Sequence, residues 1–248
     1  MATTRPIERK SGVAIWRQIT DEIRSDIMAG NFQPGARMPA EMELAERFGV
    51  NRHTVRSAIA ALTQEGVLRA EQGRGTFVAN ARRLTYKIGR RTRISQGLEK
   101  QVNETRGILL ASSREMANAD IALGLNMPEG AAVIRLETMH SADGRPISIA
   151  THWIDAERFP AIAEDYAVST SMTLAFKAAG LTDYFRKSTT ISAHHATPED
   201  LKYLKLSPGA IVLAARAINV DTQGKPVQYS LTRFSADRME LSIENETL

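Results

Sequence analysis

Cysteine is absent from this chain of 248 residues, which excludes disulfide bonds, thiol chemistry and a cysteine-based zinc site. The sequence also has no apolar run long enough to span a bilayer and no signal-peptide pattern at its N-terminus. We therefore expect a cytoplasmic protein without a membrane partner. What is present is an ordinary globular composition, 43% hydrophobic and 24% charged, at a length that favours two domains.

Positive charge is concentrated in one short segment. Residues 81–106 carry 8 Lys and Arg against 2 Asp and Glu, a net charge of +6, whereas residues 1–80 carry +2 and residues 107–248 carry −4. A slightly basic head, a basic joint and an acidic body indicate an anionic partner for the N-terminal part. No amphipathic apolar face accompanies the basic segment, which argues against a membrane surface.

Apolar residues at helical spacing predict three helices in the N-terminal part. The first is built on isoleucines four residues apart and ends at Gly30. A second, short helix opens at Pro39 and closes at Gly49, and the third runs over residues 51–62. This order is a helix-turn-helix, in which the last helix enters the major groove of DNA. The isoleucines are Ile15, Ile19, Ile23 and Ile27.

The start of the third helix carries a cluster of hydrogen-bond donors. Asn51 is a good N-cap, since its side-chain oxygen can accept a backbone N–H of the first turn. Four donor residues then crowd the exposed face, where they suit base edges and phosphates. The alternative is a solvated helix face without a partner. The four donors are Arg52, His53, Thr54 and Arg56.

A glycine-rich turn follows the third helix. Strand-like runs over residues 67–70 and 76–78 flank Gln72, Gly73 and Arg74, which predicts a β-hairpin. A hairpin at this position is the wing of a winged helix. Its glycines let the backbone approach a sugar-phosphate edge, and its arginine can enter the minor groove. A surface hairpin without contacts is the alternative.

The N-terminal part contains the motifs Pro34-Gly35, Met38-Pro39-Ala40-Glu41, Leu44-Ala45, Thr54-Val55-Arg56 and Gly73-Arg74-Gly75-Thr76-Phe77-Val78. Taken together with these motifs, residues 12–79 resemble the DNA-binding head of GntR-type transcriptional regulators. The resemblance implies operator contacts from the recognition helix and the wing. One departure is Met42, where many relatives have an arginine, so one expected DNA contact is missing. The implied residues are Arg52, Thr54 and Arg56 as direct contacts, Asn51 and His53 as tuning residues, and Gln72, Gly73 and Arg74 in the wing.

The body contains a duplication. Residues 122–146 and, about eighty residues later, residues 203–226 each read helix, turn, strand and a hairpin with glycine at its turn. Two such copies predict pseudo-symmetric halves that share an antiparallel sheet, with a cleft possible between them.

The body also resembles the UTRA effector-sensing domain of the HutC subfamily, over about residues 88–243. The resemblance implies an α+β fold similar to chorismate lyase, with a central antiparallel sheet and outer helices. The resemblance is narrowed to PhnF-type regulators of phosphonate uptake and breakdown by three stretches, residues 50–54, 89–95 and 229–233. The expected domains are a winged helix-turn-helix over residues 1–80, a basic linker over residues 81–94 and an effector-binding and dimerisation domain over residues 95–248.

In this subfamily the effector lies between the linker-proximal segment and the sheet. Relatives that bind amino-sugar phosphates have two arginines at the Thr138 and His140 positions and a glutamate at the Gln228 position, so a different ligand is implied here. Arg93 would then be the main cationic anchor, because a guanidinium matches phosphate-type oxygens. The alternative is a solvated basic linker beside ordinary core or surface residues. The full implied effector set is Thr92, Arg93, Thr138, His140, Ser171, Thr173, Gln228 and Phe234.

We therefore expect an effector-responsive repressor that binds double-stranded operator DNA as a homodimer on a near-palindromic site. Its effector would be a small anion, namely a phosphonate, a phosphate or a sugar phosphate. A regulator of sugar-phosphate or amino-acid catabolism is the alternative within the subfamily, and a DNA-binding architectural protein whose body only dimerises is another.

An enzyme is disfavoured, and neither a metal, a cofactor nor a catalytic residue is expected. The sequence has no nucleophile elbow, P-loop or metal-spaced cluster. His194 and His195 are adjacent, and neighbours on a strand point to opposite faces, so they do not readily serve one ion.

Overall fold

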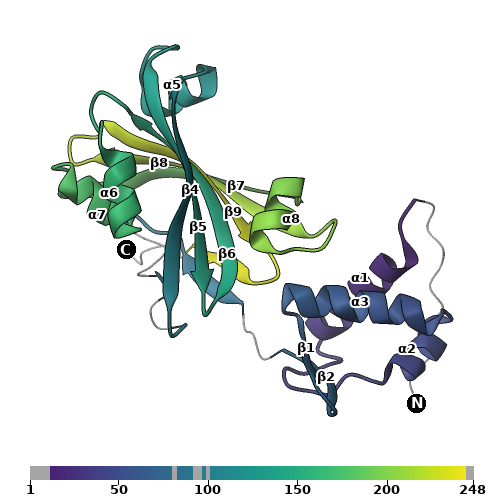
Figure 1. Ribbon diagram of the computed structural model, residues 1–248. Coiled ribbons are helices and arrows are strands. Elements are labelled where there is room, and N and C mark those ends of the chain that lie inside the picture. Colours follow the sequence, from purple (N-terminus) through teal and green to yellow (C-terminus); the bar gives the residue numbers. More distant parts are fainter. Residues whose placement is uncertain (1–11, 80–82, 92–96, 99–100, 244–248) are drawn as a thin grey trace. The chain divides into compact units, whose positions relative to one another are not determined.

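The computed structural model describes residues 12–79, 83–91, 97–98 and 101–243 (Figure 1). The chain divides into two compact units, residues 1–82 and 83–248, each with its own hydrophobic cores. Among the described residues, no helix has both the length and the apolar composition to cross a membrane.

The first unit is a three-helix bundle followed by a β-hairpin. The isoleucine stripe of the first helix buries Ile19 and Ile23 completely, and they share one core with Phe48, Val55 and Leu62. This packing confirms the predicted winged helix-turn-helix. Its elements are α1 (Ile15–Met28), α2 (Glu41–Phe48), α3 (Arg52–Glu65), β1 (Leu68–Glu71) and β2 (Gly75–Val78).

The second helix begins later than predicted. Its N-cap is Ala40, whose backbone is extended and whose N–H donates to the Glu43 carboxylate at 2.8 Å. That side-chain bond satisfies the free amide outside the helix, so Pro39 lies before α2 rather than opening it. At the other end Gly49 takes a left-handed conformation with φ 65°, as expected for a C-cap glycine.

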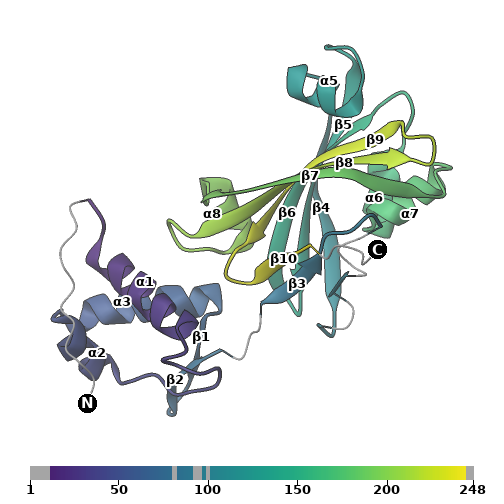
Figure 2. The same cartoon turned by 180° about the vertical axis from the view of Figure 1, so that it is seen from behind.

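A six-stranded antiparallel sheet forms the body, in the order β4-β5-β6-β9-β8-β7 (Figures 1 and 2). Each half supplies three adjacent strands, and β6 and β9 pair at the centre. This arrangement confirms the predicted duplication and shared sheet, and adds one leading strand to each copy. The strands are β4 (Thr105–Met116), β5 (Ala132–Ala142), β6 (Arg145–Asp155), β7 (Tyr184–His195), β8 (Ile211–Asp221) and β9 (Pro226–Ser235).

Helices cover both faces of this sheet. One face, which we call the cavity face, carries Leu136 and Val227 against α6 and α7. The opposite face, the far face, packs Val133 and Tyr229 against α5 and Val212 against α8. The four helices are α5 (Ala119–Leu125), α6 (Ile162–Ser169), α7 (Met172–Ala178) and α8 (Pro198–Leu204).

The described part of the basic segment belongs to the second unit. Strand β3 (Leu84–Lys87) pairs in parallel with β10 (Met239–Ser242), and the Tyr86 ring packs 5.6 Å from that of Phe234 on the cavity face. Farther along, Arg91 forms an ion pair with Asp183 at 2.9 Å. The small β3–β10 sheet therefore covers the part of the cavity face that α6 and α7 leave open.

Candidate DNA-reading surface and effector cavity

The recognition helix begins where the sequence predicted. The Asn51 Oδ1 atom accepts the backbone N–H of His53 at 2.8 Å, which confirms Asn51 as the N-cap. His53 is exposed and Thr54 is half-buried on the first turn, while Val55 is fully buried in the core. With Val55 buried, the donor-bearing face of α3 is turned outward.

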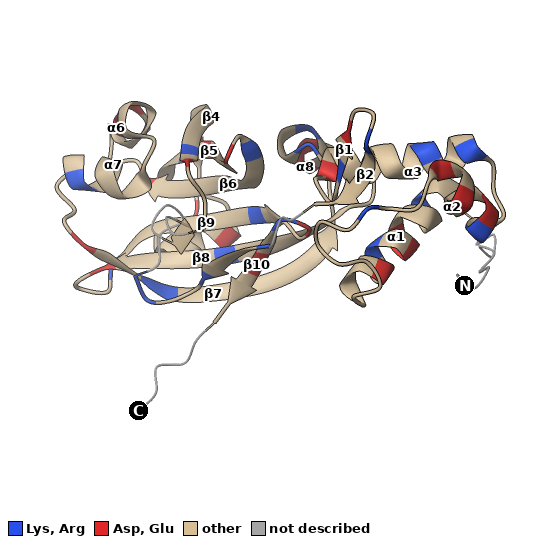
Figure 3. Ribbon diagram, turned by 90° about the horizontal axis from the view of Figure 1, so that it is seen from below, with Lys and Arg blue, Asp and Glu red and all other residues tan. Residues whose placement is uncertain are grey.

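A carboxylate that the sequence reading missed pairs with both arginines that are predicted to contact DNA. Glu41, at the start of α2, accepts from Arg52 Nε at 2.7 Å and from Arg56 Nε and Nη2 at 3.1 and 3.0 Å. Hydrogen bonds from Arg56 and then Arg52 lower the Glu41 pKa to about 2. The arginine side chains nevertheless stay 54% and 51% exposed. Figure 3 shows red acidic segments of α2 beside blue basic segments of α3.

The wing is similarly arranged. Arg74 forms an ion pair with Glu71 at 2.7 Å and keeps 74% of its side chain exposed. Gly73 has φ 72°, a conformation that side chains rarely adopt, and Gln72 beside it is exposed. Met42, at the position of the missing family arginine, is 59% exposed on α2. Helix start and wing therefore both present cations to solvent, and their DNA contacts stay a prediction.

The cavity face of the second unit borders a partly open cavity of about 240 Å³ between the sheet, α6–α7 and the β3 strand. That volume is slightly below the range of about 300–1,000 Å³ typical of drug-sized ligands, which suits a small metabolite. Thr138 lies just outside the wall, and Thr92 and Arg93 lie outside the described residues. The predicted effector residues that do line the space are His140, Ser171, Thr173, Gln228 and Phe234.

A chain of hydrogen bonds crosses the cavity floor, with one residue from each of four adjacent strands. Asn219 Nδ2 donates to Gln228 Oε1 at 2.5 Å, and Gln228 Nε2 lies 2.8 Å from His152 Nδ1. Since an amide nitrogen only donates, Nδ1 accepts, and the His152 proton is on Nε2, 3.1 Å from Thr138 Oγ1. Thr138 in turn donates to the Ala150 carbonyl at 3.4 Å. Thr138 therefore positions the His152 ring although it does not itself line the cavity.

Some polar atoms of this wall have no hydrogen-bond partner among the described residues: His140 Nδ1, the Tyr166 hydroxyl and Arg186 Nε. Burial raises the Tyr166 pKa to about 12, and the nearby Thr138 hydroxyl offsets only part of that shift. Arg186 donates through Nη2 to the Tyr86 hydroxyl at 3.2 Å. Buried donors and acceptors without partners are costly, so this wall is suited to a ligand that satisfies them.

The two floor histidines predict acid sensitivity. Burial lowers the pKa of His140 to about 4 and that of His152 to about 3, below the ordinary 6.5. Well above pH 6.5 both histidines are neutral in the folded protein and in the unfolded chain, so burying them costs no additional free energy. Below it the unfolded chain takes up protons that the folded unit refuses, so the free energy of unfolding falls by at most about 1.4 kcal/mol per pH unit per histidine.

This prediction is measured by urea unfolding between pH 7 and 5, above the range where most carboxylates titrate. Trp153 fluorescence in a Trp16→Phe background reports on the second unit alone. The His152→Gln variant should show a smaller slope than its parent. A free energy of unfolding that does not change between pH 7 and 5 would show that both histidines take up protons as readily in the folded protein as in the unfolded chain.

Gly107 on β4 is required by close packing at the cavity wall. A Cβ atom there would lie 2.6 Å from the Thr170 carbonyl oxygen and 3.2 Å from His140 Nε2. We expect Gly107→Ala to cost about 1–3 kcal/mol of unfolding free energy, because the backbone after α6 must move. Denaturant unfolding measures it, with Ser113→Ala, exposed on the same strand, as the control. Equal stability of the two variants would contradict the packing.

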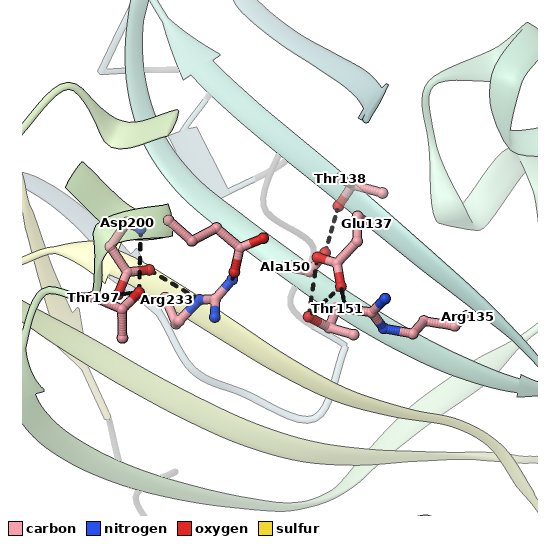
Figure 4. A network of polar contacts seen from close by, with 9 residues as sticks. Arg135, Glu137, Thr138, Ala150, Thr151, Thr197, Asp200 and Arg233 are labelled. Atoms are coloured by element: carbon pink, nitrogen blue, oxygen red, sulfur yellow. Dashed lines mark hydrogen bonds and ion pairs between the residues drawn. The ribbon is translucent and has the colours of Figure 1, made fainter. Parts of the chain in front are cut away.

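A second polar cluster lies on the far face. Glu137 neighbours Thr138 in sequence but points away from the cavity, where its carboxylate accepts from Thr151 at 2.9 Å and pairs with Arg135 (Figure 4). Burial raises the Glu137 pKa, and Thr151 and Arg135 oppose that shift. Arg233 pairs there with Asp200 at 3.1 Å. Among the described residues no group of three His, Asp or Glu side chains is placed to hold a metal ion.

Sequence reasoning did not find several lining residues. His152, Asn219 and Arg186 reach the cavity from β6, β8 and β7, and Tyr166 reaches it from α6. Because side chains alternate between the two faces of a sheet, the sequence indicates which residues of one strand share a face. Which strands are neighbours, and in which register, comes only from the folded sheet.

Comparisons with known proteins agree with this architecture. Residues 16–78 match the family described as "Bacterial regulatory proteins, gntR family", and residues 100–240 match the "UTRA domain". An uncharacterized HTH-type transcriptional regulator of Rhizobium meliloti is 52% identical, covering 96% of this chain and 98% of the relative. The "Probable fructoselysine utilization operon transcriptional repressor" of Escherichia coli K12 is 30% identical, covering 96% and 98%.

Among solved structures, PhnF from Mycobacterium smegmatis superposes with a TM-score of 0.63 at 24% identity, covering 93% of this chain and all of that chain, which supports the fold. The named relatives are transcriptional regulators, consistent with a protein that is not an enzyme. A winged helix-turn-helix and a duplicated α+β body, each matched by its own family description, thus establish that the chain belongs to the GntR family of transcriptional regulators, with a UTRA domain as its body.

Proposed function

We propose that this regulator is a homodimeric repressor of an uptake or catabolic operon and that a small anionic ligand releases it from its operator. The observation that carries the proposal is the cavity of the UTRA domain. Its wall combines one guanidinium, Arg186, with buried polar atoms that have no partner among the described residues. A body that only dimerised would gain nothing from such atoms, because each one lowers stability until a ligand satisfies it.

The resemblance to PhnF-type regulators favours a phosphonate as the ligand. A sugar derivative is the second candidate, because a relative that covers the whole chain is named for the fructoselysine utilization operon. The lining is consistent with either, since hydroxyl and amide side chains accompany the one guanidinium.

Release requires the ligand to bind two arrangements of the dimer with different affinity. A shift from mostly bound to mostly free needs about 5.5 kcal/mol of differential affinity for a full response. The basic segment is the candidate connection, because β3 contributes Tyr86 to the cavity wall immediately after the first unit ends.

The test is fluorescence anisotropy with overlapping duplexes from the DNA upstream of the chain's own gene. We expect one duplex to bind far more tightly than the rest, with affinity falling steeply over a salt series. Addition of phosphonates or sugar phosphates should then release it. Affinity that ignores the DNA sequence would contradict specific recognition, and binding that no anion alters would favour a body that serves dimerisation alone.

A further inference from the structure

The described wall of the cavity contains no carboxylate. Of the twenty described residues that line it, only Arg186 carries a permanent charge, and the others offer hydroxyl, amide, imidazole or apolar groups. Glu137, whose neighbour Thr138 supports the floor, is held on the far face by Thr151 and Arg135. An ammonium group on a ligand would therefore enter without a counter-charge in the described wall.

The floor itself is built to stay neutral. His152 is fixed between an amide donor at Nδ1 and a hydroxyl at Nε2, so both ring nitrogens are used in the uncharged form. Burial keeps the neighbouring His140 neutral as well. A second cation in this space would be desolvated and repelled by Arg186, and an unpaired buried charge is among the costliest groups in a protein.

Hydroxyl groups have partners here. The His140 Nδ1 atom and the Tyr166 hydroxyl are buried and make no hydrogen bond with described residues, and a hydroxyl can both donate and accept. The guanidinium of Arg186 supplies the matching site for phosphate-type oxygens, with its Nε also unused among described partners.

We propose that the effector is an anion whose other polar groups are uncharged hydroxyls, and that the cavity rejects the corresponding amines. Arg186 holds the anionic group, and Gln228 is a specificity-determining residue because its amide keeps the floor neutral. The proposal rests on the function proposed above, since it concerns the ligand of the same cavity.

Two matched pairs of probes test it on the full-length chain. 2-Hydroxyethylphosphonate is compared with 2-aminoethylphosphonate, and glucose 6-phosphate with glucosamine 6-phosphate, by thermal shift and titration calorimetry at millimolar concentration. Each pair differs only by hydroxyl against ammonium. The expected result is that at least one pair binds and that its hydroxyl member has a Kd lower by about tenfold or more. Equal affinities, a preference for the amine, or no binding by any of the four overturns the proposal.

A carboxylate placed in the wall should reverse the preference. Gln228→Glu supplies one at the floor, and Thr232→Asp supplies one on the half-buried part of the same strand, should the first variant fold poorly. Either folded variant should favour the amine member of the binding pair. Thr190→Asp, exposed on β7 outside the cavity wall, is the matched control and should keep the preference for hydroxyl. An unchanged preference in both wall variants counts against the proposal.

The operator assay distinguishes a wrong ligand class from a wrong proposed function. If one upstream duplex binds specifically but the amine probes bind more tightly than the hydroxyl probes, the proposed ligand class is wrong while the proposed regulatory function is retained. If no duplex binds specifically, the proposed function itself fails.

Discussion

The Arg52→Ala variant is expected to lose operator binding while its folding and its oligomeric state are unchanged. The side chain is 54% exposed at the start of α3, and its bond to Glu41 uses only one of five guanidinium N–H groups. A bidentate contact between arginine and guanine contributes about 1–3 kcal/mol. In the proposed homodimer both half-sites lose it, which weakens binding by roughly 30-fold at the least and more than 10,000-fold at the most.

Anisotropy with the operator duplex measures this loss, and circular dichroism with light scattering checks the fold and the assembly. Arg145→Ala is the matched control, because it removes the same charge from the exposed first residue of β6 in the other unit. Its binding should stay within a few-fold of the parent. If Arg52→Ala bound the operator as tightly as Arg145→Ala, or if its oligomeric state changed, its assigned role would be wrong.

The Arg186→Gln variant is expected to keep operator affinity and lose the response to ligand. Arg186 is the one permanently charged residue of the described cavity wall, and hydrogen bonds to charged groups contribute about 1.5–3 kcal/mol. The Kd of the anion that binds the parent should therefore rise by roughly 10- to 150-fold. The measurement is calorimetry with that anion, followed by release of the operator duplex at increasing anion concentration.

Arg216→Gln is the control for this variant. It removes the same charge from β8, next to β7, but from the exposed far face of the sheet. Arg186→Lys should recover part of the affinity, since a lysine keeps the charge without the planar fork. If Arg186→Gln bound the anion as tightly as the parent, the anchor would be elsewhere, and Arg93, implied by the family resemblance, would be the first position to examine.

Regular periodicity made the first unit predictable. The isoleucines of α1 repeat at helical spacing and all face one core, and Gly49 ends α2 in a left-handed conformation as predicted, whereas α3 continues past the predicted end at Leu62 to Glu65, before the left-handed Gly66. The start of α2 was predicted wrongly because a side chain of the following turn, Glu43, satisfies the Ala40 amide outside the helix. The spacing of apolar residues does not indicate such a hydrogen bond, so it could not place the start of the helix.

The duplication of the body could be predicted from the sequence, but the two edge strands of its sheet could not. The repeated helix–strand–hairpin units were visible because their buried strands are apolar and their turns contain glycine. Strands β4 and β7 lie at the two edges of the sheet, and much of β7 is exposed and polar, so neither has a clear alternation. Their place follows from pairing with β5 and β8.

By itself the sequence determined the helix-turn-helix, the wing and the duplicated body, because each depends on local spacing along the chain, and its motifs resembled those of the family. Only the tertiary structure decided that Glu41 joins Arg52 to Arg56, and that Asn219, Gln228 and His152 form one neutral floor. These groups lie on different elements, and their meeting depends on helix docking and strand register. A carboxylate one residue from the floor, Glu137, ends on the opposite face for the same reason: successive residues of a strand point to opposite sides.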